Sequence, residues 1–255
     1  MSEPKPLRSD IAHSTADRIV VRGHDLVDLI GRVPLGDVAF LELKGRLPTA
    51  QESVVFNAIT VTLVEHGLTP SAIAARLTYL GAPESLQAAV AAGLLGLGGR
   101  FGGTVEDAAR VLQTAVAEAG PESDLREVAR EVVRRHRAER RLIPGIGHPT
   151  HKDVDPRVPR LFEVAAANGL AGRHVELVQL VGEEATAALG RPLPVNATGA
   201  IGAIASELEI AWQVCRGLAV MARAIGLVAH VQEELTQPIA SEIWTRVEDE
   251  ASDGV

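Results

Sequence analysis

The chain has 255 residues, 46% hydrophobic and 23% charged, a composition typical of a globular protein that buries a sizeable core. Aromatic residues make up only 3%, which argues against a β-sandwich or barrel and favours closely packed helices. The net charge of −8 disfavours nucleic acid as a partner, and the apolar stretches carry charged residues or histidine too closely spaced for a membrane span. The single cysteine, Cys215, excludes an internal disulfide, predicts an inert core thiol and suits a cytoplasmic protein.

In chain order, the sequence begins with residues 1–16, a polar segment that we expect to be a flexible tail. A short β-like run follows at residues 18–22. The first strong helix signal is Thr49 with Glu52 three residues later, a capping box. This helix should end near Gly67, because glycine accepts the positive φ of a helix C-terminal cap.

Further helices are expected to begin at Thr69-Pro70, Ser85, Thr104 and Pro121, and to cover 158–168, 173–189 and 212–234. The glycines within residues 98–103 should break the chain between two of them. The last helix should bury one apolar stripe, made of Val214, Leu218, Met221, Ile225 and Val228. The helix from Pro121 ends in five arginines: Arg134, Arg135, Arg137, Arg140 and Arg141. A solvated helix face explains them by default, and phosphate binding is the alternative.

The densest polar cluster lies in residues 143–157, whose prolines forbid a continuous helix. Gly145 and Gly147 expose backbone amides that can lie against a ligand. His148 can share a proton near neutral pH, and Arg157 offers a fork of donors that matches a carboxylate. This pattern favours a site for a carboxylated ligand, although a polar loop without function can have the same composition.

No metal site is expected from this sequence. His148 and His151 are three residues apart, but there is no H-E-x-x-H pattern, and a loop rich in proline does not hold the pair on one helical face. The glycines near residues 96–103 are not a dinucleotide-binding fingerprint, because no strand precedes them.

Five ordered segments resemble the citrate synthase superfamily. Residues 145–157 contain G-I-G-H, then Lys152, then D-P-R, and this is similar to the family's G-[FY]-G-H, basic residue and D-P-R. The other four are R-G-H-D-L at 22–26, G-R-L-P-T at 45–49, E-H-G with a later serine at 65–71, and M-A-R-A-I-G-L-V-A-H at 221–230. The phrase R-F-G-G at 100–103 resembles the citryl-CoA lyase branch, which includes the C-terminal portion of ATP-citrate lyase.

The resemblance implies an all-α, citrate-synthase-like fold with the active site in a cleft between two domains. The large helical domain would take residues 17–103 and 198–255, and the small helical domain residues 104–197. A homodimer or higher homo-oligomer is also implied. The ligands would be an acyl-CoA and a small carboxylate, with a coenzyme A thioester as substrate or product and no permanently bound cofactor.

The same resemblance implies roles for individual residues. His66 would hydrogen-bond the carboxylated substrate, and His148 would contact its alkoxide or carbonyl oxygen. Arg157 and Arg223 would hold carboxylates, and Lys152 would meet a phosphate. The backbone that would receive the adenine part of coenzyme A comprises Ile143, Pro144, Gly145, Ile146 and Gly147.

Three positions depart from the family pattern. Phe101 replaces a histidine of citrate synthases, as in the lyase branch, and this favours cleavage over synthesis. Asn196 stands in place of the essential aspartate of the family's N-V-D. An amide is not a base, so Asn196 would at most hydrogen-bond an enolate. The candidates to carry the acetyl-carbon proton instead are His24, His151 and Asp153. Gln237 replaces an arginine that reaches across the family dimer, and a substrate with one carboxylate fewer would explain this loss.

The sequence therefore predicts a citryl-CoA lyase-like enzyme that cleaves citryl-CoA, or an analogue, to acetyl-CoA and a 2-oxo acid such as oxaloacetate. Two alternatives stay open. One is a lyase or synthase for a different 3-hydroxy-3-carboxyacyl-CoA, and the other is a catalytically silent CoA-binding or regulatory homologue.

Overall fold

The structure, a computed structural model, describes residues 8–148 and 153–253, apart from the side chain of Arg100. Helices dominate this part of the chain, as expected for an all-α fold, and one small antiparallel sheet lies near the N-terminus. Its strands, in the order β1-β2-β3, are β1 (Ala12–Ser14), β2 (Ile19–Val21) and β3 (His24–Asp25). Residues 1–16 were expected to form a flexible tail. Residues 12–14 of this segment instead form β1, an exposed edge strand that pairs with β2.

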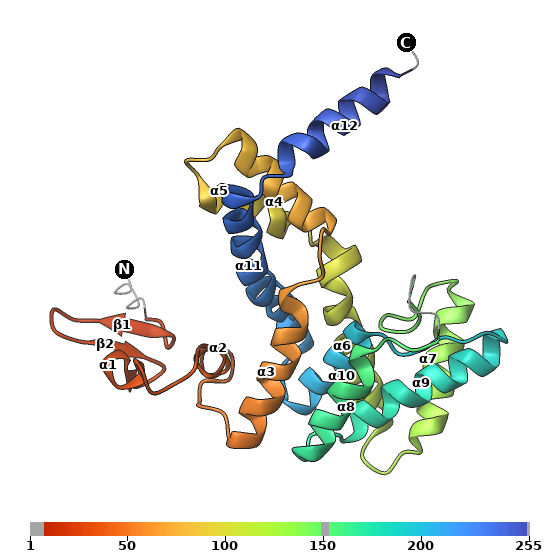
Figure 1. Cartoon of the computed structure of the whole chain (residues 1–255). Coiled ribbons are helices and arrows are strands. Elements are labelled where there is room, and N and C mark those ends of the chain that lie inside the picture. Colours follow the sequence, from red (N-terminus) through yellow and green to blue (C-terminus); the bar gives the residue numbers. More distant parts are fainter. Residues whose placement is uncertain (1–7, 149–152, 254–255) are drawn as a thin grey trace, which may run out of the picture.

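The helices follow the sheet and continue to the C-terminal end of the described residues. They are α1 (Leu26–Leu29), α2 (Leu35–Lys44), α3 (Ala50–Val64), α4 (Pro70–Gly81), α5 (Leu86–Leu95), the π-helical turn η1 (Gly98–Gly102), α6 (Gly103–Ala119), α7 (Leu125–Ala138), α8 (Arg157–Ala167), α9 (Arg173–Leu189), α10 (Ala197–Glu207), α11 (Trp212–Thr236) and α12 (Ala240–Ser252). Figure 1 shows α3 and α11 in the middle, the sheet and α1 on one side, and α7 to α10 on the other. α12 extends away from this body.

The first turns of α3 and α4 form as predicted. Thr49 Oγ1 accepts the amide of Glu52 at 3.2 Å, and the Glu52 carboxylate accepts the amide of Thr49 at 2.8 Å. α4 begins at Pro70 behind the N-cap residue Thr69. Gly67, beyond the end of α3, has a φ of +74°, which confirms the predicted stop.

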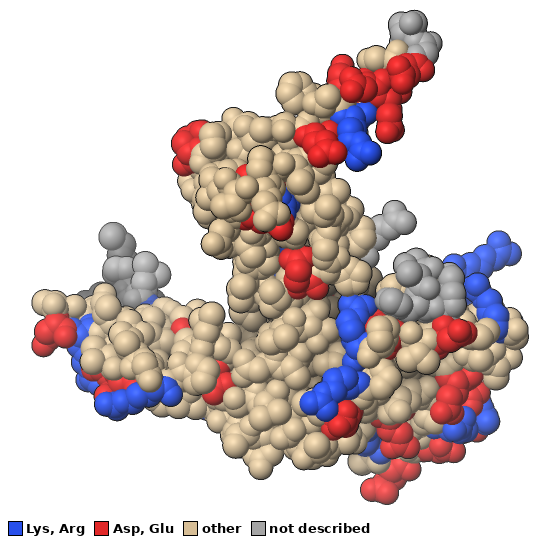
Figure 2. Space-filling view, viewed as in Figure 1, with Lys and Arg blue, Asp and Glu red and all other residues tan. Residues whose placement is uncertain are grey.

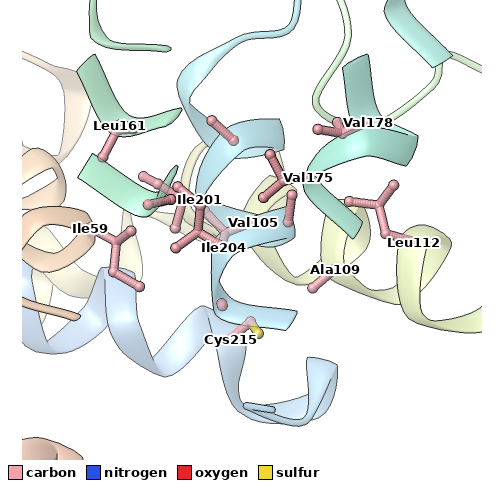
Figure 3. Packing of buried hydrophobic residues seen from close by; sticks show 14 of the residues in the cluster. Ile59, Val105, Ala109, Leu112, Leu161, Val175, Val178, Ile201, Ile204 and Cys215 are labelled. Atoms are coloured by element: carbon pink, nitrogen blue, oxygen red, sulfur yellow. The ribbon is translucent and has the colours of Figure 1, made fainter. Parts of the chain in front are cut away.

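The core lies where α3, α6, α8, α9, α10 and α11 meet (Figure 3). α10 is the most enclosed of these helices, and Ile201 and Ile204 are fully buried in it. Its small residues allow close approach, since a Cβ on Gly202 would lie 2.9 Å from the amide nitrogen of Ala109 on α6. Cys215 is also fully buried, and burial raises the pKa of its thiol to about 12, as expected for an inert core thiol.

The predicted helices differ from the structure in three places. A break near residues 98–103 does separate two helices, since α5 ends at Leu95 and Gly98 has a φ of +42°, but residues 98–102 then form the π-helical turn η1, which passes directly into α6. α7 begins at Leu125 and not at Pro121, since Asp124 provides the cap by accepting the amide of Arg126 at 2.9 Å. α12 has no counterpart among the predicted helices.

The buried stripe expected on α11 is wrong in four of its five residues. Leu218 is buried, but Val214, Met221, Ile225 and Val228 expose 36% to 53% of their surface. The side that faces inward instead comprises Cys215, Leu218, Ala219, Ala222, Arg223, Gly226, Leu227, Val231 and Glu234. The helix is apolar nearly all round, so the spacing of its apolar residues does not identify the face that is buried. The small residues identify it, because a Cβ on Gly226 would collide with the carbonyl oxygen of Val64 at the end of α3.

α11 is also long and apolar enough to cross a membrane, judged by length and composition alone. In this structure it packs against α3, α4, α5 and α6, as core helices of soluble proteins do. Figure 2 shows charged side chains gathered over the region of α7 to α9 and along α12, while the middle of the visible face is largely uncharged.

The cationic end of α7 is paired with carboxylates in part. Arg134 and Arg135 both bind Glu131, and Arg135 also binds Glu118 at 2.9 Å. These exposed pairs fit the solvated helix face that the sequence predicts by default.

Candidate active site

The glycine loop, residues 145–148, lies against the segment that leads into α10. Two backbone hydrogen bonds join them, Gly147 N to Pro194 O at 2.7 Å and Asn196 N to Gly145 O at 2.9 Å, and together they form an antiparallel bridge between Ile146 and Val195. These contacts fix the backbone of Gly145 and Gly147, two of the residues expected to bind coenzyme A.

Two glycines make this contact possible. Gly145 has a φ of +83°, and a Cβ there would lie 2.5 Å from the Cα of Gly199 in the first turn of α10. A Cβ on Gly199 would in turn collide with the carbonyl oxygen of Gly145. The glycine loop therefore touches α10 directly and ends at His148, which is half-buried.

Asp155 connects the same helix to Arg157. The buried carboxylate accepts Arg157 N (3.2 Å) and Nε (2.9 Å) on Oδ1, and Arg157 Nη2 (2.8 Å) and Ala197 N (2.9 Å) on Oδ2. Burial raises the pKa of Asp155, but the hydrogen bonds from Arg157 and Ala197 outweigh this effect and bring the pKa to about 2. Arg157 is thus oriented by a protein carboxylate, and among the described residues its Nη1 has no partner.

Asn196 caps α10 and reaches the glycine loop with its side chain. Its Oδ1 accepts the amides of Thr198 (3.0 Å) and Gly199 (3.2 Å), while its Nδ2 donates to Gly147 O at 2.6 Å. Each polar atom of the amide therefore already has a protein partner, which is the arrangement of a structural residue.

The triplet Asn196-Ala197-Thr198 also corrects the alignment with N-V-D. Matched letter by letter, Asn196 takes the place of the motif's asparagine and Thr198 that of its aspartate. Thr198 Oγ1 donates to Asn196 Oδ1 at 2.7 Å and keeps its lone pairs for a ligand donor. Since a hydroxyl is not basic near neutral pH, the departure from the family pattern remains, but it lies two residues further along the chain.

A second group of expected residues lies where α3 ends against α11. Glu65 Oε1 accepts the amides of His66 (2.7 Å) and Gly67 (2.8 Å) and lies 3.3 Å from Arg223 Nη1. Partial burial raises the pKa of Glu65, but the His66 amide, His230 and Arg223 together bring it below its usual range. The His66 side chain is exposed, and Arg223 Nε is buried without a hydrogen-bond partner, so both have capacity for a ligand.

Arg76, which is fully buried, links this group to the start of α12. It donates to Glu234 Oε2 at 2.6 Å and to His230 Nδ1 at 3.1 Å, and it also pairs with Glu233. Glu234 Oε1 in turn accepts the amide of Ala240, the first residue of α12, at 2.7 Å. Because arginine only donates, Nδ1 is the acceptor and the ring proton of His230 sits on Nε2, 3.2 Å from Glu65 Oε2. We call Glu65, Arg76, Arg223, His230 and Glu234 the ionic cluster. A single arginine among alanines on α4 gives no sequence signal of this role.

The remaining candidates are placed as follows. Lys152 and His151 lie outside the described residues. His24 is in β3, which pairs with β2, and Figure 1 places β2 on the other side of α3 from α8 to α10, so a single chain does not bring His24 to the glycine loop. Phe101 lies half-exposed in η1, and Gln237 directly follows α11. Within residues 8–148 and 153–253, no group of three or more His, Cys, Asp or Glu side chains is arranged to hold a metal ion.

In a mainly helical fold, the glycine loop with His148 and the Asp155-bound Arg157 lie beside the first turn of α10, as the resemblance to citrate synthases leads us to expect. A family model described as citrate synthase, C-terminal domain, matches residues 51–244, and the chain belongs to this family.

Among solved structures, citryl-CoA lyase from Hydrogenobacter thermophilus is similar over 91% of this chain and 88% of that chain, with a TM-score of 0.84 and 37% identity. ATP citrate lyase from Methanosaeta concilii, solved in complex with (3S)-citryl-CoA, is 25% identical with a TM-score of 0.76, over 92% of this chain and 40% of that one. ATP-citrate synthase beta chain protein 1 of Arabidopsis thaliana is 30% identical over 84% of this chain. The chain spans 37% of the length of that plant relative.

Proposed function

We propose that the protein cleaves citryl-CoA, or a similar carboxylated 3-hydroxyacyl-CoA, to acetyl-CoA and a 2-oxo acid such as oxaloacetate. The observation that carries this proposal is the similarity to a citryl-CoA lyase over nearly the full length of both chains, 91% and 88%. The site supports it, because a glycine loop, two histidines and two arginines are groups that bind a polycarboxylate and a thioester. The proposal includes no metal and no permanently bound cofactor.

In this reaction the substrate hydroxyl loses its proton, its oxygen becomes the carbonyl of the 2-oxo acid, and the bond to the acetyl carbon breaks. The electron pair of that bond passes to the thioester as an enolate, which takes up one proton to give acetyl-CoA. His148 would contact the oxygen that becomes the carbonyl, and His66 would hydrogen-bond a carboxylate. Arg157 and Arg223 would hold carboxylates through the guanidinium N–H groups that are not bound to Asp155 and Glu65.

Coenzyme A would bind along the backbone of residues 143–147, with Lys152 near a phosphate. The hydrogen bonds between the glycine loop and the approach to α10 support this assignment, because they pre-organise exposed backbone groups. Residues 104–197 would form the small domain and close over both ligands.

Thr198 and Gln237 support the two other candidate functions. Both lack the charge that the family pattern has at these positions, so a substrate with fewer carboxylates, a different 3-hydroxy-3-carboxyacyl-CoA, would fit the site. Thr198 also leaves the acetyl-carbon proton without an assigned carrier, which is what a silent CoA-binding or regulatory homologue would show.

We also propose that the protein is a homo-oligomer, at least a dimer, and that it works in the cytoplasm. The exposed apolar residues Met221, Ile225 and Val228 on α11, and Trp244 on the projecting α12, support a second copy as the partner of this face. The lone buried cysteine supports a reducing compartment. Sedimentation velocity should show dimers that Ile225→Glu weakens, whereas Leu189→Glu, an exposed apolar residue at the end of α9, should not.

The direct test of function is to incubate the purified protein with citryl-CoA and to measure oxaloacetate and acetyl-CoA together. We expect equal amounts of both, and a rate lower by about 100-fold or more in His148→Ala. His13→Ala, an exposed histidine in β1, is the matched control and should keep the wild-type rate. Calorimetric binding of CoA without either product would support the silent homologue, and cleavage of another acyl-CoA only would support the second candidate.

A further inference from the structure

Asn196 makes contacts that differ from those of a catalytic group. Its Oδ1 faces two backbone amides and the Thr198 hydroxyl, and its Nδ2 faces the carbonyl oxygen of Gly147 at 2.6 Å. Because one side of the amide meets only donors and the other meets an acceptor, its orientation is determined by these neighbours. The residue is thereby attached to α10 on one side and to the glycine loop on the other.

The acceptor, Gly147 O, belongs to the same peptide unit as the amide nitrogen of His148. A peptide unit is planar, so fixing the carbonyl oxygen also fixes the direction in which the chain enters His148. The two backbone bonds to residues 194–196 hold Gly145 O and Gly147 N, which belong to other peptide planes. The Asn196 side chain supplies that constraint from 49 residues away in the sequence.

We propose that Asn196 is a positioning residue that holds the Gly147–His148 peptide plane, and through it His148, against the first turn of α10. The catalytic consequence rests on the proposed lyase function, whereas the structural consequence does not. Asn196 itself does not touch the reacting atoms in this proposal.

Aspartate at this position distinguishes positioning from acid–base chemistry. The ionised carboxylate of Asn196→Asp has no hydrogen to donate to Gly147 O, and its oxygen would repel that carbonyl across the same short distance. The protonated carboxyl restores the donor. The Gly147 carbonyl favours this neutral form and raises the pKa of the new group, whereas the amides of Thr198 and Gly199 favour the ionised form and lower it. The bond is therefore present at low pH and lost as pH rises. If residue 196 instead served as the base of the reaction, Asn196→Asp would gain activity as pH rises.

The experiment compares wild type, Asn196→Asp, Asn196→Ala and the control Asn168→Asp by hydrogen–deuterium exchange and by citryl-CoA turnover, between about pH 5 and about pH 8. Asn168 is a matched control, because its Nδ2 also donates to a backbone carbonyl, Val164 O at 2.8 Å, at the end of α8. After correction for intrinsic rates, we expect peptides covering residues 143–148 to exchange at least about tenfold faster in Asn196→Ala at all pH values. In Asn196→Asp we expect this only at the higher pH, and in Asn168→Asp not at all.

Turnover should follow the same order. In Asn196→Asp it should fall relative to wild type by about 100-fold as the pH rises through the pKa of the new carboxyl, as for a misplaced catalytic group. Unchanged exchange of the glycine loop in both Asn196 variants would overturn the proposal even if no citryl-CoA is cleaved. Turnover of Asn196→Asp that rises with pH above wild type would overturn it in favour of a base. Failure of the wild type to cleave citryl-CoA, with the expected exchange pattern, would reject the lyase function and keep the positioning role.

Discussion

The glycine loop and the ionic cluster are held by different forces. At the glycine loop the contacts are neutral: a backbone bond of 2.7 Å from Gly147 to Pro194, and a close fit between Gly145 and Gly199. In the ionic cluster they are charged, and the pair of Arg76 with Glu234 at 2.6 Å is almost completely shielded from solvent. The first region depends on shape, and the second on a balance of buried charges.

This difference predicts which property of each region a substitution should change first. An added methyl group is enough to displace a loop whose position depends on glycine, whereas a charge balance tolerates changes of shape. Conversely, removing one charge from the ionic cluster leaves its partner as an unpaired charge in the low-dielectric interior, which is destabilising. We therefore expect substitutions at the loop to affect ligand binding first, and those in the ionic cluster to affect the free energy of unfolding first.

The largest effect should come from Arg76→Met, which keeps the length of the side chain but leaves Glu234 buried without its counter-charge. We expect the free energy of unfolding to fall by about 3–5 kcal/mol in urea denaturation. Arg134→Met, in an exposed pair on α7, is the control and should change it by less than about 1 kcal/mol. Adding Glu234→Gln to Arg76→Met should recover part of the loss. Two additive losses would show that the buried pair is not coupled.

Gly199→Ala should have the next largest effect, because its Cβ would meet the backbone oxygen of Gly145 and backbone does not yield as a side-chain tip does. We expect a loss of about 3 kcal/mol, with weaker CoA binding in calorimetry under conditions where the variant is still folded. Gly217→Ala on α11 has open space around it and should change stability by no more than about 1 kcal/mol. Equal effects of the two substitutions would contradict the close fit of the loop.

Local features of this fold could be predicted from the sequence, and features that depend on packing could not. The caps at Thr49 and Thr69 were predictable, because the residues that make them are within three positions of each other. The inner face of α11 was not, since an apolar helix offers several stripes and the close approach of Gly226 to the end of α3 selects among them. The π-helical turn η1 likewise follows from packing and has no pattern of its own.

The candidate site shows the same division. The glycine loop and Arg157 were recognisable because they lie within one short segment, residues 145–157. The loop's hold on α10 was not, because Asn196 meets Gly147 only in the folded chain, and this contact is what separates the roles of Asn196 and Thr198. Arg76 could not be recognised at all, since its partners come from the far end of the sequence.

Asp155→Asn tests a charged group at the first turn of α10, next to the neutral contacts of the glycine loop. The amide nitrogen would face donors from Arg157 and Ala197, so we expect a loss of about 2 kcal/mol at pH 7. The pKa of Asp155 is about 2 against an ordinary 3.8, so the stability it contributes is complete above about pH 4 and is lost as pH falls toward 2. Melting temperatures should therefore fall less steeply between pH 4 and pH 2 in Asp155→Asn than in wild type or in the exposed control Asp28→Asn. Identical slopes would mean that Asp155 is not ionised in the folded protein.

The smallest effect should come from His230→Asn, which separates the two halves of the ionic cluster. Asparagine Oδ1 can replace Nδ1 as the acceptor for Arg76, but the shorter side chain no longer reaches Glu65. Glu65 keeps the amides of His66 and Gly67, so we expect a loss of only about 1 kcal/mol. His230→Leu removes the acceptor as well and should lose about 2 kcal/mol, because Arg76 then has an unpaired buried donor. Equal losses in urea denaturation would mean that Arg76 relies on Glu233 and Glu234 alone, and that the ionic cluster ends at α12 without reaching the residues beside His66.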